Sequence, residues 1–465
     1  MPLIAPTRTL LLGSGGREHA LTWKLAAEPG GNEVVVAPGS DGIGEEPRVR
    51  CLPAVDPLDA GGVVKAARKV QAELVVVGPE APLAAGVADA LLEAGIPVFG
   101  PTRAAARIET SKAFCHEVAA AAGVRMARAA AFADLGQALA HARRMDAGDV
   151  GIVVKADGLA GGKGVTMCES LDDAQAAIRA AFGASPGRPS PAADVAEAAA
   201  PVVVIEERLE GREASVIALC NGETALALPA ARDHKRLLDG DRGPNTGGMG
   251  AYSPIPDLPD PLVDWVVERV HQPILAELAR RGTPFRGALY AGLMLTADGP
   301  VLLECNARFG DPETQAVLPR LAVALGPLLL AAARGDLRSA VRSLGLEASR
   351  LPTTRDATVA IVLAAAGYPA EPRNGEAIGG IEDARAAGCL VFHAGTRRQG
   401  DDFVAHGGRV LSVVGRGADL PSARAAAERG ADLVTFEGSQ RRHDLGATFY
   451  VPPREAVAAE VRLTR

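Results

Sequence analysis

The chain has 465 residues, of which 48% are hydrophobic and 23% are charged, so it is long enough for several domains with their own cores. A net charge of −7 and an aromatic content of 3% argue against a basic nucleic-acid surface and against stacking platforms for single strands. Six scattered cysteines without a Cys-x-x-Cys pair are typical of a reducing cytoplasm. No unbroken apolar stretch has the length of a membrane span. We therefore expect a cytoplasmic protein that binds neither nucleic acid nor membrane.

The first hundred residues alternate short apolar strands with helices. Strands are predicted at residues 9–12, 33–37, 73–77 and 97–99, with helices at 18–27, 58–71 and 83–94. This alternation is typical of a parallel sheet covered on both faces, in which ligands bind beyond the carboxyl ends of the strands. The loops at these ends, residues 13–19, 38–42 and 78–80, are rich in small and polar residues.

The remainder of the chain mixes strands and helices less regularly. Helices are predicted at residues 111–122, 171–182 and 261–280, and strands at 151–155, 163–167, 202–206, 213–220, 288–295 and 301–304. A surface insertion at 183–200 and a long loop at 231–254 are expected between them. From about residue 351, strands at 358–363 and 408–414 and a helix at 421–429 predict a separate C-terminal α+β unit.

The segment from Lys155 to Lys163 joins two strands through a glycine-rich turn that contains Gly161 and Gly162. Glycines let backbone N–H groups approach phosphate oxygens, and an ammonium group neutralises their charge. The order differs from the strand–GxxxxGK[ST]–helix arrangement, because Gly164 and a strand follow the second lysine. A tight hairpin with two solvated lysines is the alternative interpretation.

The strand that closes on Glu206 and Glu207 suggests a nucleotide edge. Its backbone can pair with adenine and a carboxylate can accept hydrogen bonds from ribose hydroxyls, although a merely charged strand end would have the same sequence.

Strand alternation places Glu304, Asn306 and Arg308 on one face at the end of an apolar strand. A carboxylate and an amide oxygen two residues apart suit Mg²⁺ held jointly with nucleotide phosphates, and Arg308 would then clamp a phosphoryl or acyl-phosphate oxygen. The alternative is a strand with one solvated polar face.

A charged cluster at residues 232–236 precedes the glycine-dense segment 243–254. This segment is either a disordered connection or a loop that covers substrate, and Asp233 is a candidate partner for a small ammonium group. Four of only seven lysines, Lys112, Lys155, Lys163 and Lys235, fall in the motifs described here. A point charge on a flexible stem can follow a phosphoryl group where a planar guanidinium is harder to fit.

The N-terminal Gly13-x-Gly15 suggests a dinucleotide site, but Glu18 stands where the third glycine should be. The N-terminus of the helix near Arg17 still suits a phosphate. His19 is interpreted as a packed or capping residue rather than a catalyst.

Taken in order, these segments resemble the phosphoribosylamine–glycine ligase family of the ATP-grasp superfamily. The residues that carry the resemblance are 13–20, 78–83, 111–114, 155–164, 233–236, 243–254, 308–315, 367–369 and 391–396. The family differs in having Asn commonly at Ser14 and Ser40, and Cys at Ala307. The resemblance implies that ATP, glycine and 5-phospho-β-D-ribosylamine give glycinamide ribonucleotide, ADP and phosphate through a glycyl phosphate, in purine synthesis.

The resemblance also implies a multidomain α/β and α+β fold. It consists of an N-terminal parallel-sheet domain for phosphoribosylamine (residues 1–108), an ATP-grasp core of two α+β lobes (109–330, with a mobile lobe at 124–200) and a C-terminal α+β domain (331–465). A monomer with Mg²⁺ or Mn²⁺ as cofactor is expected.

The residue roles that the resemblance implies divide among ATP, metal and the two other substrates. For ATP they are Lys112, Lys155, Lys163, Gly161, Gly162, Glu206, Glu207, Leu209 and Glu213, and for the metal Glu304 and Asn306. The catalytic residues are Arg308, Asp233 and Lys163, of which Asp233 and Arg308 would position glycine and its acyl phosphate. Substrate binding is assigned to Gly15, Gly16, Arg17, Gly39, Glu80, Asp233, Lys235, Asn245, Gly248 and Asp311.

Three other functions are alternatives at this point. They are a different ATP-grasp carboxylate–amine ligase, an NAD-dependent oxidoreductase built on the N-terminal sheet, and a non-catalytic nucleotide-binding regulator.

Overall fold

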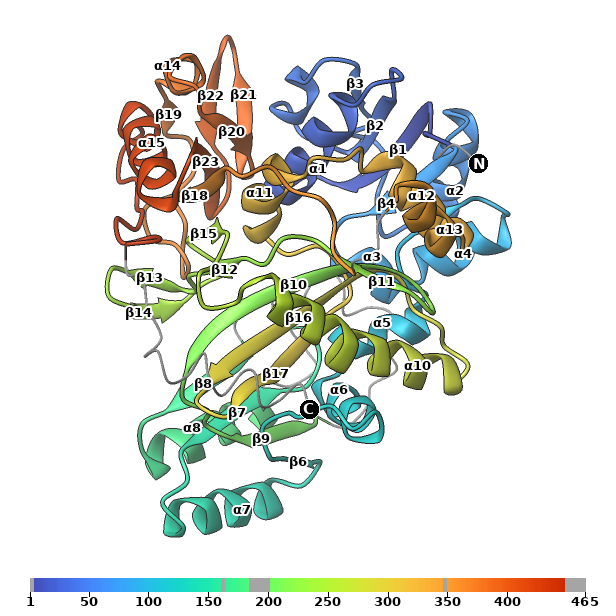
Figure 1. Ribbon diagram of the computed structural model, residues 1–465. Coiled ribbons are helices and arrows are strands. Elements are labelled where there is room, and N and C mark those ends of the chain that lie inside the picture. The colour runs from blue at the N-terminus through green and yellow to red at the C-terminus, as the bar shows by residue number, and fades with distance from the viewer. Residues whose placement is uncertain (1–3, 160–163, 184–200, 346–348, 448–465) are drawn as a thin grey trace.

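A computed structural model describes residues 4–159, 164–183, 201–345 and 349–447 (Figure 1). Gly161, Gly162 and Lys163 lie outside the described residues, as does the predicted insertion at 183–200 apart from Gly183. Among the described residues, no helix combines the length and the apolar character needed to cross a membrane.

The N-terminal part is the predicted parallel sheet, with strand order β3-β2-β1-β4-β5. Its strands are β1 (Arg8–Gly13), β2 (Glu33–Pro38), β3 (Val49–Cys51), β4 (Leu74–Val77) and β5 (Val98–Phe99). One face packs on α2 (Ala60–Lys69) and α4 (Val87–Glu93), and the other packs on α1 (Gly16–Ala26) and α12 (Gly326–Arg334). The apolar strands are buried because both faces are covered.

The helix predicted at 83–94 is two helices, α3 (Glu80–Ala85) and α4. Gly86 lies between them with φ +84°, a left-handed conformation that ends α3. Glu80 is the first residue of α3 and follows β4 after the two residues Gly78 and Pro79.

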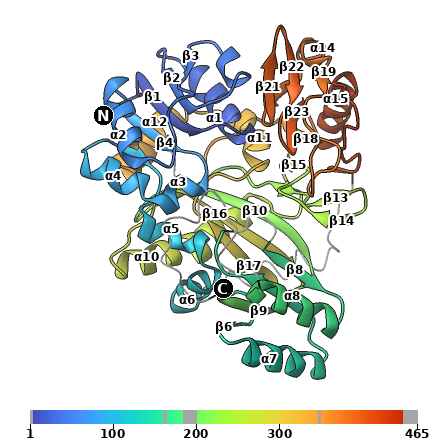
Figure 2. The ribbon, with the colours of Figure 1, turned by 180° about the vertical axis from the view of Figure 1, so that it is seen from behind.

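Two antiparallel sheets follow (Figures 1 and 2). The first, β6-β9-β7-β8, contains β6 (Ala129–Phe132), β7 (Ile152–Ala156), β8 (Val165–Cys168) and β9 (Val203–Glu207), and it packs on α7 (Leu135–Ala147) and α8 (Leu171–Gly183) in a small core of its own. The second, β11-β10-β16-β17, contains β10 (Arg212–Asn221), β11 (Ala225–Ala227), β16 (Arg286–Thr296) and β17 (Gly299–Asn306).

The helix predicted at 261–280 is continuous but irregular. It runs through α9 (Asp260–Val266), a π-helical turn (Val267–His271) and α10 (Gln272–Arg280). Ile274, Leu275 and Leu278 are fully buried on the face that packs toward the second sheet. Helices α5 (Arg103–Thr110) and α6 (Lys112–Ala121) complete this region.

The prediction of a long loop at 231–254 is wrong, because this segment contains four short strands. They are β12 (Arg232–Asp233), β13 (Arg236–Leu238), β14 (Arg242–Asn245) and β15 (Gly250–Ser253). Strand β15 pairs antiparallel with β18 (Ala357–Ala364), so a segment with little side-chain bulk obtains its backbone hydrogen bonds from a strand more than a hundred residues away. Periodicity gives no sign of such a distant partner.

The C-terminal part is consequently joined to the middle of the chain through one sheet, β12-β15-β18-β23-β20. Its further elements are β19 (Ala377–Ile378), α14 (Ile381–Ala386), β20 (Leu390–His393), β21 (Thr396–Gln399), β22 (Asp402–Ala405), β23 (Arg409–Gly417) and α15 (Leu420–Leu433). Between β17 and β18 the chain forms the helices α11 (Glu313–Val317), α12 and α13 (Leu337–Ser343). The predicted boundary at 330/331 falls inside α12, which packs on the N-terminal sheet.

In Figures 1 and 2 the N-terminal and C-terminal parts lie side by side, with α1 and α11 between them. The two antiparallel sheets lie together on one side of both parts.

Candidate active site

A cavity of about 950 Å³ lies where these regions meet. The predicted site residues that line it are Arg17, Glu80, Lys112, Lys155, Glu206, Glu207, Leu209, Glu213, Asp233, Lys235, Asn245, Glu304, Asn306, Arg308 and Asp311. Gly15, Gly16, Gly39 and Gly248 are not among the lining residues. One cavity therefore contains most of the residues that the motifs singled out.

Lys155 is held in the cavity wall by a buried carboxylate. Its Nζ lies 2.8 Å from Glu206 Oε1 and donates to the carbonyl of Leu303 at 3.1 Å. His116 Nε2 lies 2.7 Å from the same Glu206 oxygen. Burial raises the pKa of Glu206, but the hydrogen bond from His116 and the charge of Lys155 outweigh it and leave the pKa below its usual value. Glu206 thus fixes Lys155, and the motifs gave no indication of His116.

Lys112 stands at the start of α6, opposite the glycine-rich turn. Its Nζ donates to the carbonyl of Gly158 at 2.8 Å. The Asp157 carboxylate accepts hydrogen bonds from the backbone N–H of Lys112 and from Ser111 Oγ, which ties the turn to this helix end. Burial lowers the pKa of Lys112, with Glu304 and Asp157 opposing the shift. Lys112 is therefore positioned by Asp157 and Gly158, directly after β7.

The carboxylate and amide on β17 share one face, as predicted. Glu304, Asn306 and Arg308 line the cavity, and Cys305 also borders it, whereas Ala307 is buried and does not line it. Asn306 Nδ2 lies 3.3 Å from Glu304 Oε1. Although burial raises the pKa of Glu304, the ammonium groups of Lys235 and Lys155 hold it below its usual value. The pair presents an ionised carboxylate and an amide oxygen to the cavity.

Arg308 is clamped between two carboxylates. Its Nε lies 3.3 Å from Glu80 and its Nη2 lies 3.2 Å from Glu109, while Nη1 donates to the carbonyl of Phe309. Burial raises the pKa of Glu109, with the charge of Arg308 opposing the shift. Glu109 also accepts the backbone N–H of Ala307 at 2.7 Å. Nothing in the sequence marked Glu109, because it lies in an ordinary helical segment.

Asp233 lies in an acidic part of the wall. Burial raises its pKa to about 8, with Lys235 opposing and Glu313 adding to the rise. Lys235 Nζ lies 2.7 Å from Glu213 Oε2. The side chain of Asp233 forms no hydrogen bond with any described residue. This part of the cavity is suited to a small cationic group.

A buried hydrogen-bond chain adjoins Asp233 and was not predicted. Tyr290 Oη lies 2.8 Å from Ser215 Oγ, which lies 3.1 Å from Glu313 Oε1. All three side chains are nearly inaccessible, and Tyr290 and Glu313 line the cavity. Only the pairing of β10 with β16 brings Ser215 and Tyr290 together.

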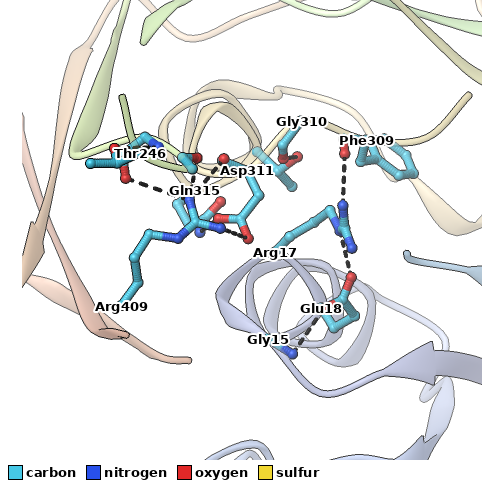
Figure 3. A network of polar contacts seen from close by, with 12 residues as sticks. Gly15, Arg17, Glu18, Thr246, Phe309, Gly310, Asp311, Gln315 and Arg409 are labelled. Atoms are coloured by element: carbon cyan, nitrogen blue, oxygen red, sulfur yellow. Dashed lines mark hydrogen bonds and ion pairs between the residues drawn. The ribbon is translucent and has the colours of Figure 1, made fainter. Parts of the chain in front are cut away.

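At the N-terminus of α1, the Glu18 carboxylate binds one backbone N–H and the neighbouring arginine. Glu18 Oε2 accepts the backbone N–H of Gly15 at 2.8 Å, and Glu18 Oε1 pairs with Arg17 Nε (Figure 3). A negative carboxylate at the position of the third glycine disfavours a dinucleotide pyrophosphate at this helix end, which argues against the oxidoreductase interpretation. Arg17 still reaches the cavity and donates to the carbonyl of Phe309.

His19 is a packed residue, as expected. It is fully buried, and its Nδ1 accepts the backbone N–H of His393 at 2.9 Å. It therefore joins the N-terminal part to the C-terminal part.

Two antiparallel sheets with lysines, an ionised carboxylate and an amide oxygen facing one cavity define an ATP-grasp enzyme. The phosphoribosylglycinamide synthetase family matches in three consecutive parts: the N domain over residues 7–109, the ATP-grasp (A) domain over 110–314 and the C domain over 358–448. Phosphoribosylamine–glycine ligase from Streptomyces coelicolor is 46% identical over 95% of this chain and 99% of its own length. That from Mesorhizobium japonicum is 44% identical over 94% and 97%. The chain belongs to the phosphoribosylamine–glycine ligase family.

Solved structures agree with this assignment. A phosphoribosylamine–glycine ligase from Thermotoga maritima has a TM-score of 0.74 at 32% identity and covers 94% of this chain and 100% of its own. The biotin carboxylase domain of a 2-oxoglutarate carboxylase from Hydrogenobacter thermophilus has a TM-score of 0.66 at 15% identity, over 94% and 92%. The second likeness concerns the fold alone. The chain is an ATP-dependent ligase of purine biosynthesis.

Proposed function

We propose that the cavity joins glycine to 5-phospho-β-D-ribosylamine with cleavage of ATP, and that the predicted residues act in the following roles. The observation that carries this proposal is the continuity of the cavity, which runs past Lys155, Glu304, Asp233 and Arg308 to Arg17. The three substrates can therefore meet without leaving the protein, as a reactive acyl phosphate requires.

ATP binds at the end formed by β7, β9 and α6. Lys112 and Lys155 contact its phosphates, and Lys163, Gly161 and Gly162 are assigned there from the motif. The Glu207 carboxylate already binds Arg128 Nε at 2.7 Å and the Arg128 backbone N–H at 2.9 Å. We therefore assign adenine recognition to the backbone from Glu207 to Leu209, which lines the cavity, and not to this carboxylate. Glu206 acts indirectly, by holding Lys155.

Glu304 and Asn306 suit Mg²⁺, or Mn²⁺, as cofactor. Within the described part of the chain, the Glu304 carboxylate forms no ion pair and accepts one side-chain hydrogen bond, from Asn306. Oxygen donors are what these ions prefer, and two protein oxygens leave room for phosphate oxygens and water. When bound, the ion would neutralise phosphate charge and make the γ-phosphoryl group more electrophilic.

Glycine binds beside Asp233, whose carboxylate accepts its ammonium group, and Lys235 shapes this subsite. Glu213, whose carboxylate lies 2.7 Å from Lys235 Nζ, stays assigned to ATP. The glycine carboxylate then attacks the γ-phosphoryl group, ADP leaves, and Arg308 holds the oxygens of the glycyl phosphate. The amine of phosphoribosylamine attacks the acyl carbon and phosphate departs. Positioning of the reactants and electrostatic stabilisation supply most of the rate.

The phosphosugar occupies the end bordered by Arg17, Glu80 and Asp311, toward Asn245. Gly15, Gly16, Gly39 and Gly248 support this end from behind, since Gly16 packs against Gln315 and Ala394, and Gly39 packs against Cys51. We infer that the protein is a cytoplasmic monomer. Free cysteines suit a reducing compartment, and the exposed large apolar side chains Ile4, Leu92, Leu238, Leu344 and Leu433 are widely separated in the sequence.

The test is phosphate release from ATP with each co-substrate omitted in turn, together with mass analysis of the product. We expect glycinamide ribonucleotide and phosphate release that requires both glycine and phosphoribosylamine. Turnover that is indifferent to glycine, or that prefers another amino acid, would instead identify a different ATP-grasp ligase.

A further inference from the structure

Arg409, at the start of β23, reaches into the phosphosugar end from the C-terminal part (Figure 3). Its Nη2 lies 2.9 Å from Asp311 Oδ2, and its Nη1 donates to the carbonyl of Asp311 at 3.0 Å. Nη1 also donates to the carbonyl of Gly247 at 2.6 Å. One guanidinium therefore joins β23, the loop before α11 and the segment between β14 and β15.

The two segments that Arg409 holds both belong to the cavity wall. Asp311 and Gly247 line it, as does Thr246, whose Oγ1 accepts the backbone N–H of Gly248. Asp311 is shared with a second cation: although burial raises its pKa, the charges of Arg409 and Arg17 hold it below the usual range. Gln315 Nε2 also donates to its Oδ1 at 2.8 Å. Asp311 is thus kept ionised with its orientation fixed.

We propose that Arg409 is a positioning residue for the phosphosugar: it fixes Asp311 and residues 246–248 against the N-terminal part, so that the C-terminal part completes the phosphoribosylamine subsite. The inference rests on the proposed function and extends it to a region in which the motifs assigned no site residue. Lys155, Glu304 and the adenine edge lie on other elements, so ATP binding does not depend on this contact.

The planar guanidinium matters in this position. It serves a carboxylate and two carbonyls at fixed angles, which a single ammonium group cannot reproduce. A lysine would keep the charge and lose part of the geometry. Comparison of Arg409→Ala with Arg409→Lys therefore separates charge from orientation.

The experiment measures KM for each substrate in R409A, R409K and the control R416A. Arg416 lies on the same strand but is exposed. Phosphoribosylamine is formed in situ from ribose 5-phosphate and ammonia, and melting temperatures are recorded for all variants. We expect R409A to raise KM for phosphoribosylamine about tenfold or more, with KM for ATP and glycine changed less than about twofold. R409K should show the same selective change at smaller size, and R416A should match the wild type.

Equal changes in all three KM values, or a wild-type KM for phosphoribosylamine in R409K, would overturn the inference even if R409A folds poorly. Calorimetric binding of ribose 5-phosphate, without ATP or glycine, gives a second readout independent of turnover. Weaker binding in R409K than in R416A supports the positioning role, and equal binding contradicts it. The proposed function fails separately, if the wild type makes no glycinamide ribonucleotide.

Discussion

The two ends of the cavity are built in different ways. At the ATP end, Lys155 lies on β7 of one antiparallel sheet and Glu304 lies on β17 of the other, each within a short, recognisable motif. At the phosphosugar end, Arg17, Asp311 and Arg409 come from three parts of the chain, and each is held by groups on the others. Each group at the ATP end belongs to a short motif of its own hairpin, whereas the phosphosugar end exists only after the outer parts have packed together.

This difference suggests how substitutions should divide. A change at the ATP end removes one chemical group and leaves its frame intact. A change at the other end loosens a frame that several segments share, so its effect should fall on one substrate. The predictions below test that division, from the largest expected effect to the smallest.

Glu304→Ala should abolish ligation while the fold survives. The substitution removes the ionised carboxylate that suits the metal, and we expect kcat to fall at least about a thousandfold, with a melting temperature close to that of the wild type. Steady-state turnover and thermal melting measure the two effects. E268A, on the exposed side of the π-helical turn, is the control. Turnover near the wild-type value would refute the metal role.

Arg308→Met should damage both activity and stability. It leaves Glu80 and Glu109 without their shared cation, which we expect to reduce stability by about 3 kcal/mol, and it removes the clamp on the acyl phosphate, which should lower kcat about a hundredfold. Urea unfolding and turnover are the measurements. Loss of activity without loss of stability would show that the two carboxylates do not depend on Arg308.

The use of glycine should depend on pH through Asp233. Its folded-state pKa of about 8 lies above the ordinary 3.8, so the free enzyme binds an extra proton there at neutral pH. Because the ionised form accepts the glycine ammonium, kcat/KM for glycine should rise as the pH increases toward 8. The same proton means that the contribution of Asp233 to stability falls as the pH rises from about 4 to 8.

Asp233→Asn is the matching variant. It should lower kcat/KM for glycine about 10- to 100-fold and flatten its pH dependence, with KM for ATP little changed. A pH profile that keeps the wild-type shape in this variant would assign the titration to another group.

Glu207→Gln should have the smallest effect. The carboxylate of Glu207 is engaged with Arg128, whose side chain is largely exposed, so the loss of stability should stay below about 1 kcal/mol. KM for ATP should change less than about threefold, because we assign adenine recognition to the backbone of this segment. A tenfold rise would show instead that the carboxylate binds the nucleotide.

Much of the fold followed from local patterns. The parallel N-terminal sheet is predicted by the alternation of apolar strands and helices, and the four predicted strands agree with the structure to within one or two residues, whereas β3 was not predicted. The prediction of a loop at 231–254 was wrong, because β15 in this segment pairs with the distant strand β18. A sequence pattern reports the face that a segment buries, not the distant strand with which it pairs.

In the candidate site, too, local patterns predicted some residues, and contacts between distant elements decided others. Strand alternation was enough to place Glu304, Asn306 and Arg308 together. His116, Glu109 and Ser215 carry no sequence signal, since each acts by holding a residue from a distant element. The assignment of Gly15 and Gly16 to the phosphosugar stays a prediction; the structure adds that Glu18 accepts the backbone N–H of Gly15.

By itself, the sequence indicated the candidate chemistry: the groups that we propose neutralise phosphate, the oxygens that suit a metal, and the few lysines that remain in a chain where arginine predominates. Such properties depend on residue type and short spacing. Only the tertiary structure decided which charges are shared and by whom, including the clamp on Arg308, the raised pKa of Asp233 and the bridge that Arg409 makes to Asp311. The physical reason is that burial and ion pairing act through distances of a few ångströms, which link residues up to hundreds of positions apart.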